Sequence, residues 1–212
     1  MGGERAVDRR TIVSAALELL EEVGLDGLTT RGLAARLQVK SPALYWHFRD
    51  KQELLDEMAR AVQGRQDLGP PHEGEHWRDW LARRARERRS VLLAHRDGAR
   101  LVAGAGPGPE IAAAFDRELA ALVEQGFTPL RAMRAITALG AYVGGFVLEE
   151  QTRRDRADAP RPAPDRAAAT PVLMEAVRAG GSPDGPEAFE DGLALLLDGI
   201  EAGLAADRGL GG

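Results

Sequence analysis

Two short amphipathic segments, separated by only three or four residues, constrain the fold of this chain more than any other feature. The first, residues 29–37, repeats apolar residues at helical spacing after Thr29 or Thr30, either of which can cap a helix. The second begins at Ser41-Pro42, where serine is a favoured cap and proline lacks only an N–H that would be unpaired there. Two short helices joined by so tight a turn predict a helix-turn-helix.

The second segment, S41-P-A-L-Y-W-H-F48, places four ring-bearing side chains in one run, although only one side of a helix can face a core. Leu44 and Phe48, at i and i+4, can share the core face. Tyr45 and His47 then point outward, where their polar tips can meet a phosphate or a base edge. In a helix-turn-helix the second helix presents its N-terminal residues to the major groove of DNA. The alternative is a protein-binding module with exposed aromatic residues.

The rest of the chain also carries helical periodicity, and we find no strand pattern, internal repeat or heptad array. A first helix is expected from a cap at Asp8 to a stop at Gly24, and a fourth from a cap at Asp50. Further helices are expected at residues 77–94, 110–125, 129–151, 171–179 and 186–206. Residues 153–169, rich in proline and charge, predict a mobile loop. The predicted fold is all-α, with about ten helices; the fourth is expected to bury Leu54, Leu55, Met58, Ala61 and Val62.

The proline-rich stretch Gly69-Pro-Pro71 predicts a boundary inside the 212-residue chain, which is long enough to bury a sizeable core. We expect a helix-turn-helix DNA-binding domain at residues 1–50 and a connecting helix at 51–68. A larger helical domain for ligand binding and dimerisation is expected at 69–212.

Charge is distributed unevenly along the sequence. The net charge of −5 argues by itself against a nucleic-acid partner. Residues 29–51, however, hold five Lys and Arg against Asp50 alone, a local charge of +4 that leaves −9 for the remainder. Because a DNA-binding surface is local, the distribution matters more than the sum.

Several classes of protein find no support in the sequence. The chain has no cysteine, and its four histidines, His47, His72, His76 and His95, show no metal-ligand spacing. The glycines at 104, 106 and 108 form a lone cluster with two prolines and follow no strand, so they indicate a turn and not a phosphate cradle. No nucleophile–base pair is identifiable, and we expect neither an enzyme nor a cofactor. Without a signal peptide or a run long enough to span a membrane, the chain is expected to be cytoplasmic.

The stretch G27-L-T-T-R-G-L-A-A-R-L-Q-V-K-S-P-A-L-Y-W-H-F-R-D-K51 resembles the DNA-binding module of the tetracycline-repressor (TetR) family. Its L-Y-W-H motif is most similar to the tetracycline repressors proper. Matching motifs follow in order through the rest of the chain, and the resemblance covers residues 8–206. They are G74-E, Trp77, H95-R-D-G-A99, Q125-G-F127, V147-L-E-E-Q151 and E187-A-F189. The resemblance implies a transcriptional repressor that a small molecule releases from DNA; a regulator without a ligand, and activation instead of repression, stay open.

The resemblance also assigns roles at the DNA. Arg31 would read a guanine edge, and Lys40 occupies a position that sets operator preference in the family. Ser41, Pro42 and Ala43 would lie at the base edges, and because serine and alanine are smaller than the family's usual glutamine and threonine, we expect a different operator sequence. Trp46 is expected to be half-packed. Phosphate contacts are implied for Thr30, Tyr45, His47 and Lys51.

A single helix-turn-helix makes too few contacts with DNA to select one site in a genome. A homodimer on a palindromic operator is therefore expected, with half-sites about 34 Å apart or more. Residues 129–151 and 186–206 are the dimerisation candidates, rich in small residues that let helices approach closely. The resemblance implies an intersubunit four-helix bundle. An intramolecular bundle is the alternative.

In the tetracycline repressors a histidine ligates the drug-bound magnesium, and the Arg-Asp-Gly-Ala quartet aligns Val102 with it. Valine offers no lone pair to a hard cation, so magnesium–tetracycline is not the expected effector and a tetracycline response through an altered site is the alternative. A mostly apolar small molecule, with an acidic or hydroxyl group for an arginine, is expected instead. Its pocket is expected to be lined by Arg84, Arg88, Val102, Ala105, Phe115, Glu118, Leu119, Leu122, Ile136, Tyr142 and Glu149, with Met174 of the partner subunit.

Overall fold

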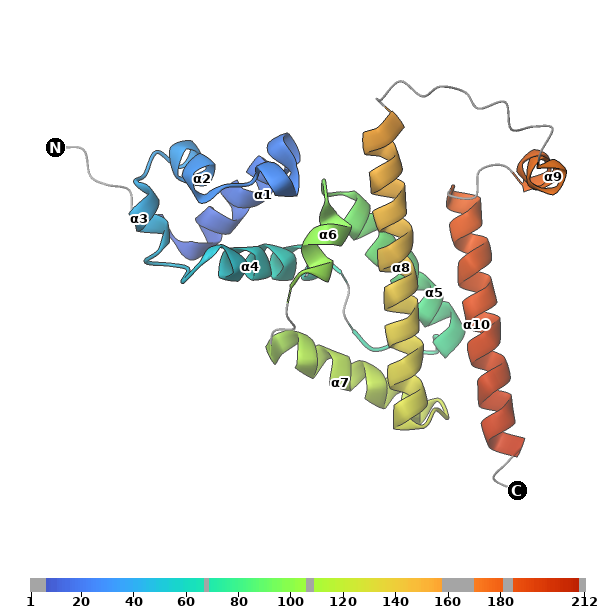
Figure 1. Cartoon of the computed structure of the whole chain (residues 1–212). Coiled ribbons are helices and arrows are strands. Elements are labelled where there is room, and N and C mark those ends of the chain that lie inside the picture. The colour runs from blue at the N-terminus through green and yellow to red at the C-terminus, as the bar shows by residue number, and fades with distance from the viewer. Residues whose placement is uncertain (1–6, 67–68, 106–108, 158–169, 181–184, 210–212) are drawn as a thin grey trace. The chain divides into compact units, whose positions relative to one another are not determined.

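The computed structural model describes residues 7–66, 69–105, 109–157, 170–180 and 185–209, and every regular element in them is an α-helix (Figure 1). The described part contains ten helices, which confirms the predicted all-α class. They are α1 (Arg9–Gly27), α2 (Thr30–Arg36), α3 (Ser41–Leu44), α4 (Lys51–Gln63), α5 (Trp77–Leu93), α6 (Gly98–Ala103), α7 (Pro109–Glu124), α8 (Pro129–Ala157), α9 (Pro171–Gly180) and α10 (Pro186–Gly209).

The chain divides into two compact units. The first comprises Met1–Pro70 and Arg86–Glu118, and the second comprises Pro71–Ala85 and Leu119–Gly212. Helices α5 and α7 each contribute residues to both units. Among the described residues no helix is long and apolar enough to cross a membrane.

Side-chain caps begin the helices of the first unit where the sequence predicts them. The Thr11 N–H donates to the Asp8 carboxylate (2.7 Å) and the Glu53 N–H donates to the Asp50 carboxylate (2.8 Å). At α2 the cap is Thr29, whose hydroxyl accepts from the N–H of Gly32 at 3.0 Å. Each cap satisfies an N–H that has no partner inside its own helix.

Helix α1 is interrupted at Gly24, the residue at which the sequence predicts a stop. Gly24 lies at φ 71° and ψ 174°, a conformation that costs glycine little, and the chain then resumes one further helical turn to Gly27. A side chain on Gly24 would also approach Asp97 Oδ2 to 3.1 Å. The interruption therefore lets α1 end against the segment that leads into α6.

The core of the first unit is built from the apolar faces of α1, α2 and α4. Ile12, Leu20, Leu33 and Met58 are fully buried. In α4, Leu54 and Val62 are buried as predicted, whereas Leu55 is half-buried. The prediction for Ala61 is wrong: it is exposed, and Ala59 is buried in its place, because the stripe follows i, i+4, i+5 and i+8 from Leu54.

In the second unit α8 and α10 pack side by side (Figure 1). The Tyr142 ring stacks on Phe189 at 5.6 Å between centroids, and its hydroxyl donates to the Phe189 carbonyl oxygen at 2.9 Å. Near the other end of the pair, Arg131 forms a two-pronged ion pair with Asp207 at 2.6 and 2.7 Å. Helix α8 continues to Ala157, so the loop predicted from residue 153 is wrong for its first residues. Residues 158–169 lie outside the described part.

Candidate nucleic-acid interface

Helices α2 and α3 pack together as the predicted helix-turn-helix. The turn between them passes through Gln38 at φ 56°, and the Val39 N–H donates back to the Ala34 carbonyl oxygen at 3.0 Å. Lys40, in an extended conformation, occupies the cap position, and its carbonyl accepts the Ala43 N–H at 2.8 Å. Ser41 is thus the first helical residue and not the predicted cap, a difference of one position.

The aromatic run divides between core and surface. Leu44 and Phe48 are each 4 % exposed, and Tyr45 is 52 % exposed, as the i, i+4 spacing predicts. His47 is half-buried. The expectation that Trp46 is half-packed is wrong, since 88 % of it is exposed. The reason is that α3 ends at Leu44 and residues 45–47 form a turn, which carries the indole away from the core.

The predicted DNA-contacting residues all lie on α2, α3, the turns beside α3 and the first residue of α4. None of them is buried. The exposed members are Arg31, Lys40, Pro42, Tyr45, Trp46 and Lys51. The half-buried members are Thr30, Ser41, Ala43 and His47.

The cations of this region fall into two groups. Arg36 is paired with Glu18 (3.1 Å) and Glu22 (2.7 Å), which raise its pKa through hydrogen bonds, Glu22 having the larger effect. In contrast, no carboxylate in the described part of the chain lies within ion-pair distance of Arg31, Lys40 or Lys51. Those three exposed charges are therefore available to a polyanion.

Helix α6 and the hydrogen-bonded junction at its start are not among the elements expected from the sequence. Asp97 is held at φ 55°, and its carboxylate accepts the Leu25 N–H at 2.7 Å. Arg100 pairs with Asp26 at 2.8 Å, and this contact is the main cause of its raised pKa. These bonds fasten α6 to the last turn of α1, just beyond the Gly24 interruption. The Asp97-Gly98 pair is the one local signal, since both residues tolerate unusual turns.

A buried histidine completes this junction. His95 is 7 % exposed; its Nδ1 lies 2.8 Å from Glu21 Oε1, and Arg65 donates to its Nε2 at 2.8 Å. Because arginine can only donate, Nε2 accepts and Nδ1 carries the proton. Arginine, imidazole and carboxylate thus form a chain that links the segment after α4, the turn between α5 and α6, and helix α1.

The residues predicted to bind a ligand are divided between the two units. In the first unit Val102 and Glu118 are buried, and Arg88, Ala105 and Phe115 are half-buried. In the second, Leu122 is buried, Glu149 is exposed and the others are half-buried: Arg84, Leu119, Ile136, Tyr142 and Met174.

Three of these side chains have partners within the second unit. The Arg84 guanidinium lies over the Trp80 ring at 5.4 Å, and Glu149 pairs with Arg153 at 3.0 Å. The Tyr142 hydroxyl is bonded to α10, as described above.

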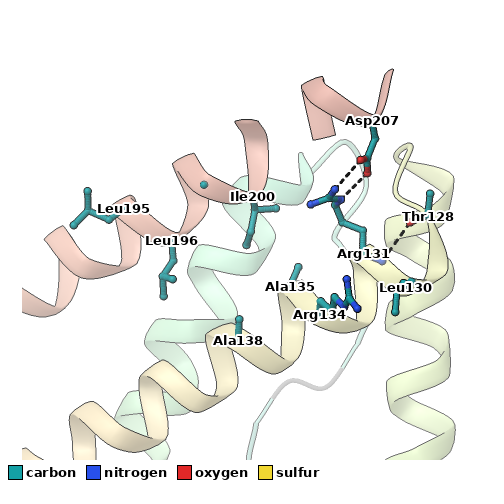
Figure 2. Close-up of a pocket in the computed structure, with 11 residues that line it drawn as sticks. Thr128, Leu130, Arg131, Arg134, Ala135, Ala138, Leu195, Leu196, Ile200 and Asp207 are labelled. Atoms are coloured by element: carbon teal, nitrogen blue, oxygen red, sulfur yellow. Dashed lines mark hydrogen bonds and ion pairs between the residues drawn. The ribbon is translucent and has the colours of Figure 1, made fainter. Parts of the chain in front are cut away.

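A groove of about 660 Å³ lies between α8 and α10 within the second unit (Figure 2). Its apolar wall combines Leu130, Ala135 and Ala138 of α8 with Leu196 and Ile200 of α10, and the Arg131–Asp207 ion pair lies at one end. None of the residues predicted to bind a ligand lines it.

A helix-turn-helix with an exposed cationic and aromatic surface, followed in the same polypeptide by a larger helical domain, is typical of transcriptional regulators. Residues 12–58 match the family described as bacterial regulatory proteins, tetR family, and residues 70–204 match the tetracyclin repressor-like C-terminal domain. The chain belongs to the TetR family of transcriptional regulators and is not an enzyme.

Individual relatives agree along nearly the whole length. The chain is 42 % identical over 191 residues to the tetracycline repressor protein class A from transposon 1721 of Escherichia coli, covering 90 % of this chain and 88 % of the relative. A solved TetR (class A) in complex with 5a,6-anhydrotetracycline and magnesium is 39 % identical, with a TM-score of 0.72 over 91 % of this chain and 96 % of that one. A possible TetR family transcriptional regulator from Streptomyces coelicolor A3(2) is 38 % identical, with a TM-score of 0.78 over 92 % and 99 %.

Proposed function

We propose that this regulator is a cytoplasmic repressor that binds a palindromic operator as a homodimer and is released by a small, mostly apolar effector. The observation that carries the DNA-binding part is the exposed surface between Arg31 and Lys51, in which Arg31, Lys40 and Lys51 form no ion pair with a carboxylate of the described residues. When such cations neutralise phosphates, the counterions condensed on the DNA are released, and this release is a large source of affinity for DNA.

Within that surface, roles follow from chemistry and from the family. Arg31 reads a guanine edge with its two-pronged guanidinium, and Pro42 and Ala43 offer apolar contact to thymine methyl groups. Lys51 and the Tyr45 hydroxyl hold phosphates and fix the register without reading sequence.

The homodimer is supported by the apolar residues exposed on α8 and α10. Leu195 is 73 % exposed, Leu130 51 % and Met133 42 %, and the groove of about 660 Å³ lies between these two helices. A methyl group on Gly144 would meet no atom within 4 Å, so that part of α8 offers an open face to a second copy. Burying such a surface against its symmetry mate stabilises a dimer.

The magnesium seen with one relative does not fit the residues of this chain. The position of the family's metal-binding histidine is held by Val102, an apolar side chain that is 9 % exposed on α6. Magnesium takes oxygen ligands and, in the family, this imidazole, neither of which valine supplies. The proposed effector therefore binds through apolar contacts, with Arg84 or Arg88 as the anchor for an acidic or hydroxyl group.

A tetracycline-class ligand held without that histidine is the second candidate. The 42 % identity to a tetracycline repressor favours it. It differs from the first proposal in one measurable respect, the response of the operator complex to the drug.

The test is fluorescence anisotropy of the full-length protein on DNA from its own upstream region, at two salt concentrations, with magnesium, with magnesium–tetracycline and with neither. Arg31→Ala is the test variant and Arg36→Ala the matched control, because both lie on α2 but Arg36 is already paired with two carboxylates. Arg31→Ala should lower discrimination against mutated operators by about tenfold, and Arg36→Ala should leave it nearly unchanged.

Tight, salt-dependent binding that the drug does not alter supports the first proposal, and a ligand search by thermal shift follows. Release by magnesium–tetracycline supports the second candidate. Equal affinity for the upstream DNA and for random DNA would overturn the repressor proposal itself.

A further inference from the structure

The first residue of α1 reaches the turn that carries the exposed Trp46. Arg9 donates from Nη1 to the backbone oxygen of His47 at 3.0 Å, and its guanidinium lies 4.7 Å above the centroid of the Phe48 ring. Its other terminal nitrogen, Nη2, donates to Glu53 Oε1 at 2.7 Å and to Glu57 Oε1 at 2.6 Å. One guanidinium thus joins α1 and α4 to the turn of residues 45–48, here called the reading turn.

Glu53 holds the same turn from its other end. Its second oxygen, Oε2, accepts the Arg49 N–H at 2.8 Å, one residue beyond Phe48. This bond and the Arg9 contact lower the pKa of Glu53 to about 2, so the carboxylate is ionised at neutral pH. Only 20 % of the Glu53 side chain is exposed, against 44 % for Arg9. The Glu53 carboxylate is therefore partly shielded, and both of its oxygens have partners.

We propose that the Arg9–Glu53–Glu57 cluster fixes the position of the reading turn, with Arg9 as a positioning residue for recognition of DNA. The inference rests on the proposed DNA-binding function. The backbone oxygen of His47 and the N–H of Arg49 flank Phe48, and the cluster holds both. With the chain held on each side of this buried ring, the outward direction of Tyr45 and Trp46 is set before DNA arrives.

The cluster also explains two carboxylates in a region whose charge should be positive. Ionised Glu53 and Glu57 lie beside the proposed DNA-binding surface, and by charge alone each would weaken binding to the phosphates of DNA. In the structure Arg9 uses both carboxylates as acceptors, and together they hold its guanidinium in place. A single acceptor fixes one N–H direction, whereas Arg9 donates to three separate oxygens.

Removing a carboxylate separates this role from general electrostatics, because the two predict opposite signs. Glu53→Gln deletes a negative charge near DNA, so charge alone predicts tighter operator binding. A positioning role predicts binding about tenfold weaker, the cost of one misplaced base or phosphate contact. Glu18→Gln is the matched control: Glu18 also pairs with an arginine of the same unit, Arg36 at 3.1 Å, but does not touch the reading turn. It should leave affinity unchanged or slightly raised.

A substitution at Arg9 tests whether this arginine contacts DNA itself. If Arg9 only positions the turn, Arg9→Met weakens operator binding by about tenfold while the slope of log affinity against log salt stays constant. If Arg9 contacts a phosphate, that slope falls by about one. Arg9→Lys keeps the charge but lacks the planar guanidinium with its several N–H donors, so its affinity for the operator should lie between those of Arg9→Met and the wild type.

The experiment combines operator anisotropy over a salt series with fluorine NMR of full-length protein containing 5-fluorotryptophan. The chain has three tryptophans, and Trp46→Phe identifies the signal from the reading turn. In Glu53→Gln and Arg9→Met, the Trp46 signal should shift or broaden without DNA, while the signals of buried Trp77 and Trp80 stay in place. Loss of all three dispersed signals would mark an unfolded variant. In that case Arg9→Lys is the variant compared with the wild type.

Failure of the wild-type protein to bind its upstream DNA would overturn the proposed function. Wild-type binding together with equal or tighter binding by folded Glu53→Gln, or a lower salt slope for Arg9→Met, would overturn the positioning inference alone.

Discussion

Replacing Gly98 by alanine should destabilise the first unit more than any other single methyl group added to α6. Gly98 is the buried first residue of α6, and a Cβ there would overlap the carbonyl oxygen of Leu92 and approach His95 Cβ to 3.3 Å. The opposing atom belongs to the backbone at the end of α5, so no rotamer change can relieve the overlap. The start of α6 must move instead.

The size of the effect is set by two opposing terms. Overpacking costs about 1–3 kcal/mol, and a clash with backbone belongs at the upper end. Alanine regains about 0.5–1 kcal/mol over glycine in a helix, which leaves a net loss of about 2 kcal/mol. For a chain of this length that corresponds to a fall in Tm of about 4–8 °C. Any shift of α6 also strains the neighbouring bond from Leu25 N–H to Asp97.

Gly104→Ala is the matched control, because it adds the same methyl group at the other end of α6. Gly104 lies at φ −84°, and its Cβ would meet the Arg100 carbonyl oxygen at an ordinary 3.5 Å. Thermal unfolding by circular dichroism, at one fixed protein concentration, should therefore separate the two variants, with Gly104→Ala equal to or above the wild type. Equal melting temperatures for Gly98→Ala and Gly104→Ala would refute the reasoning.

Three further predictions concern the second unit. Arg83 lowers the pKa of Glu75 from 4.5 to about 2, so the stability this carboxylate adds is present above about pH 4.5 and is lost as the pH falls toward 2. Glu75→Gln should therefore lower stability at pH 7 and flatten that part of the pH profile. An unchanged acid-unfolding curve would contradict this prediction. Tyr142→Phe removes the hydrogen bond to the Phe189 carbonyl oxygen and should cost about 1 kcal/mol in urea unfolding, so a variant as stable as the wild type would count against it. Leu195→Lys places a charge on a leucine that is 73 % exposed on α10, and sedimentation should show a dimer dissociation constant raised by at least about tenfold; a monomeric wild type would remove the basis for this prediction.

Most of the helical architecture could be predicted because its signals are local. Asp8 and Asp50 cap helices within three residues of themselves, and Gly24 interrupts α1 through its own backbone freedom. Helix α6 could not be predicted in this way. Its start depends on Asp97 adopting a left-handed conformation, and the Asp97 carboxylate accepts the N–H of Leu25, 72 positions earlier in the sequence. Arg100, in the same helix, pairs with Asp26 over a similar separation.

The candidate DNA surface and the candidate ligand site differ in predictability for the same reason. The residues predicted to contact DNA come from one continuous stretch, so the i, i+4 separation of Leu44 and Phe48 is enough to place Tyr45 on the outside. Trp46 was misjudged because its exposure depends on where α3 ends, and helix ends are the least certain part of a periodic pattern. The residues predicted to bind a ligand are spread from Arg84 to Met174, and only the resemblance to the family relates them.

Charge pairing explains how a chain with a net charge of −5 presents a surface suited to DNA. Counting charges treats Arg31 and Arg36 alike, although they share α2. Two carboxylates of α1 pair with Arg36, whereas Arg31 has no such partner among the described residues. Near the reading turn, the Glu53 carboxylate likewise pairs with Arg9 and accepts a backbone N–H. The potential that a phosphate meets is therefore set by which cations are left unpaired. Removing the Glu53 carboxylate should alter DNA binding through the position of the reading turn more than through the total charge.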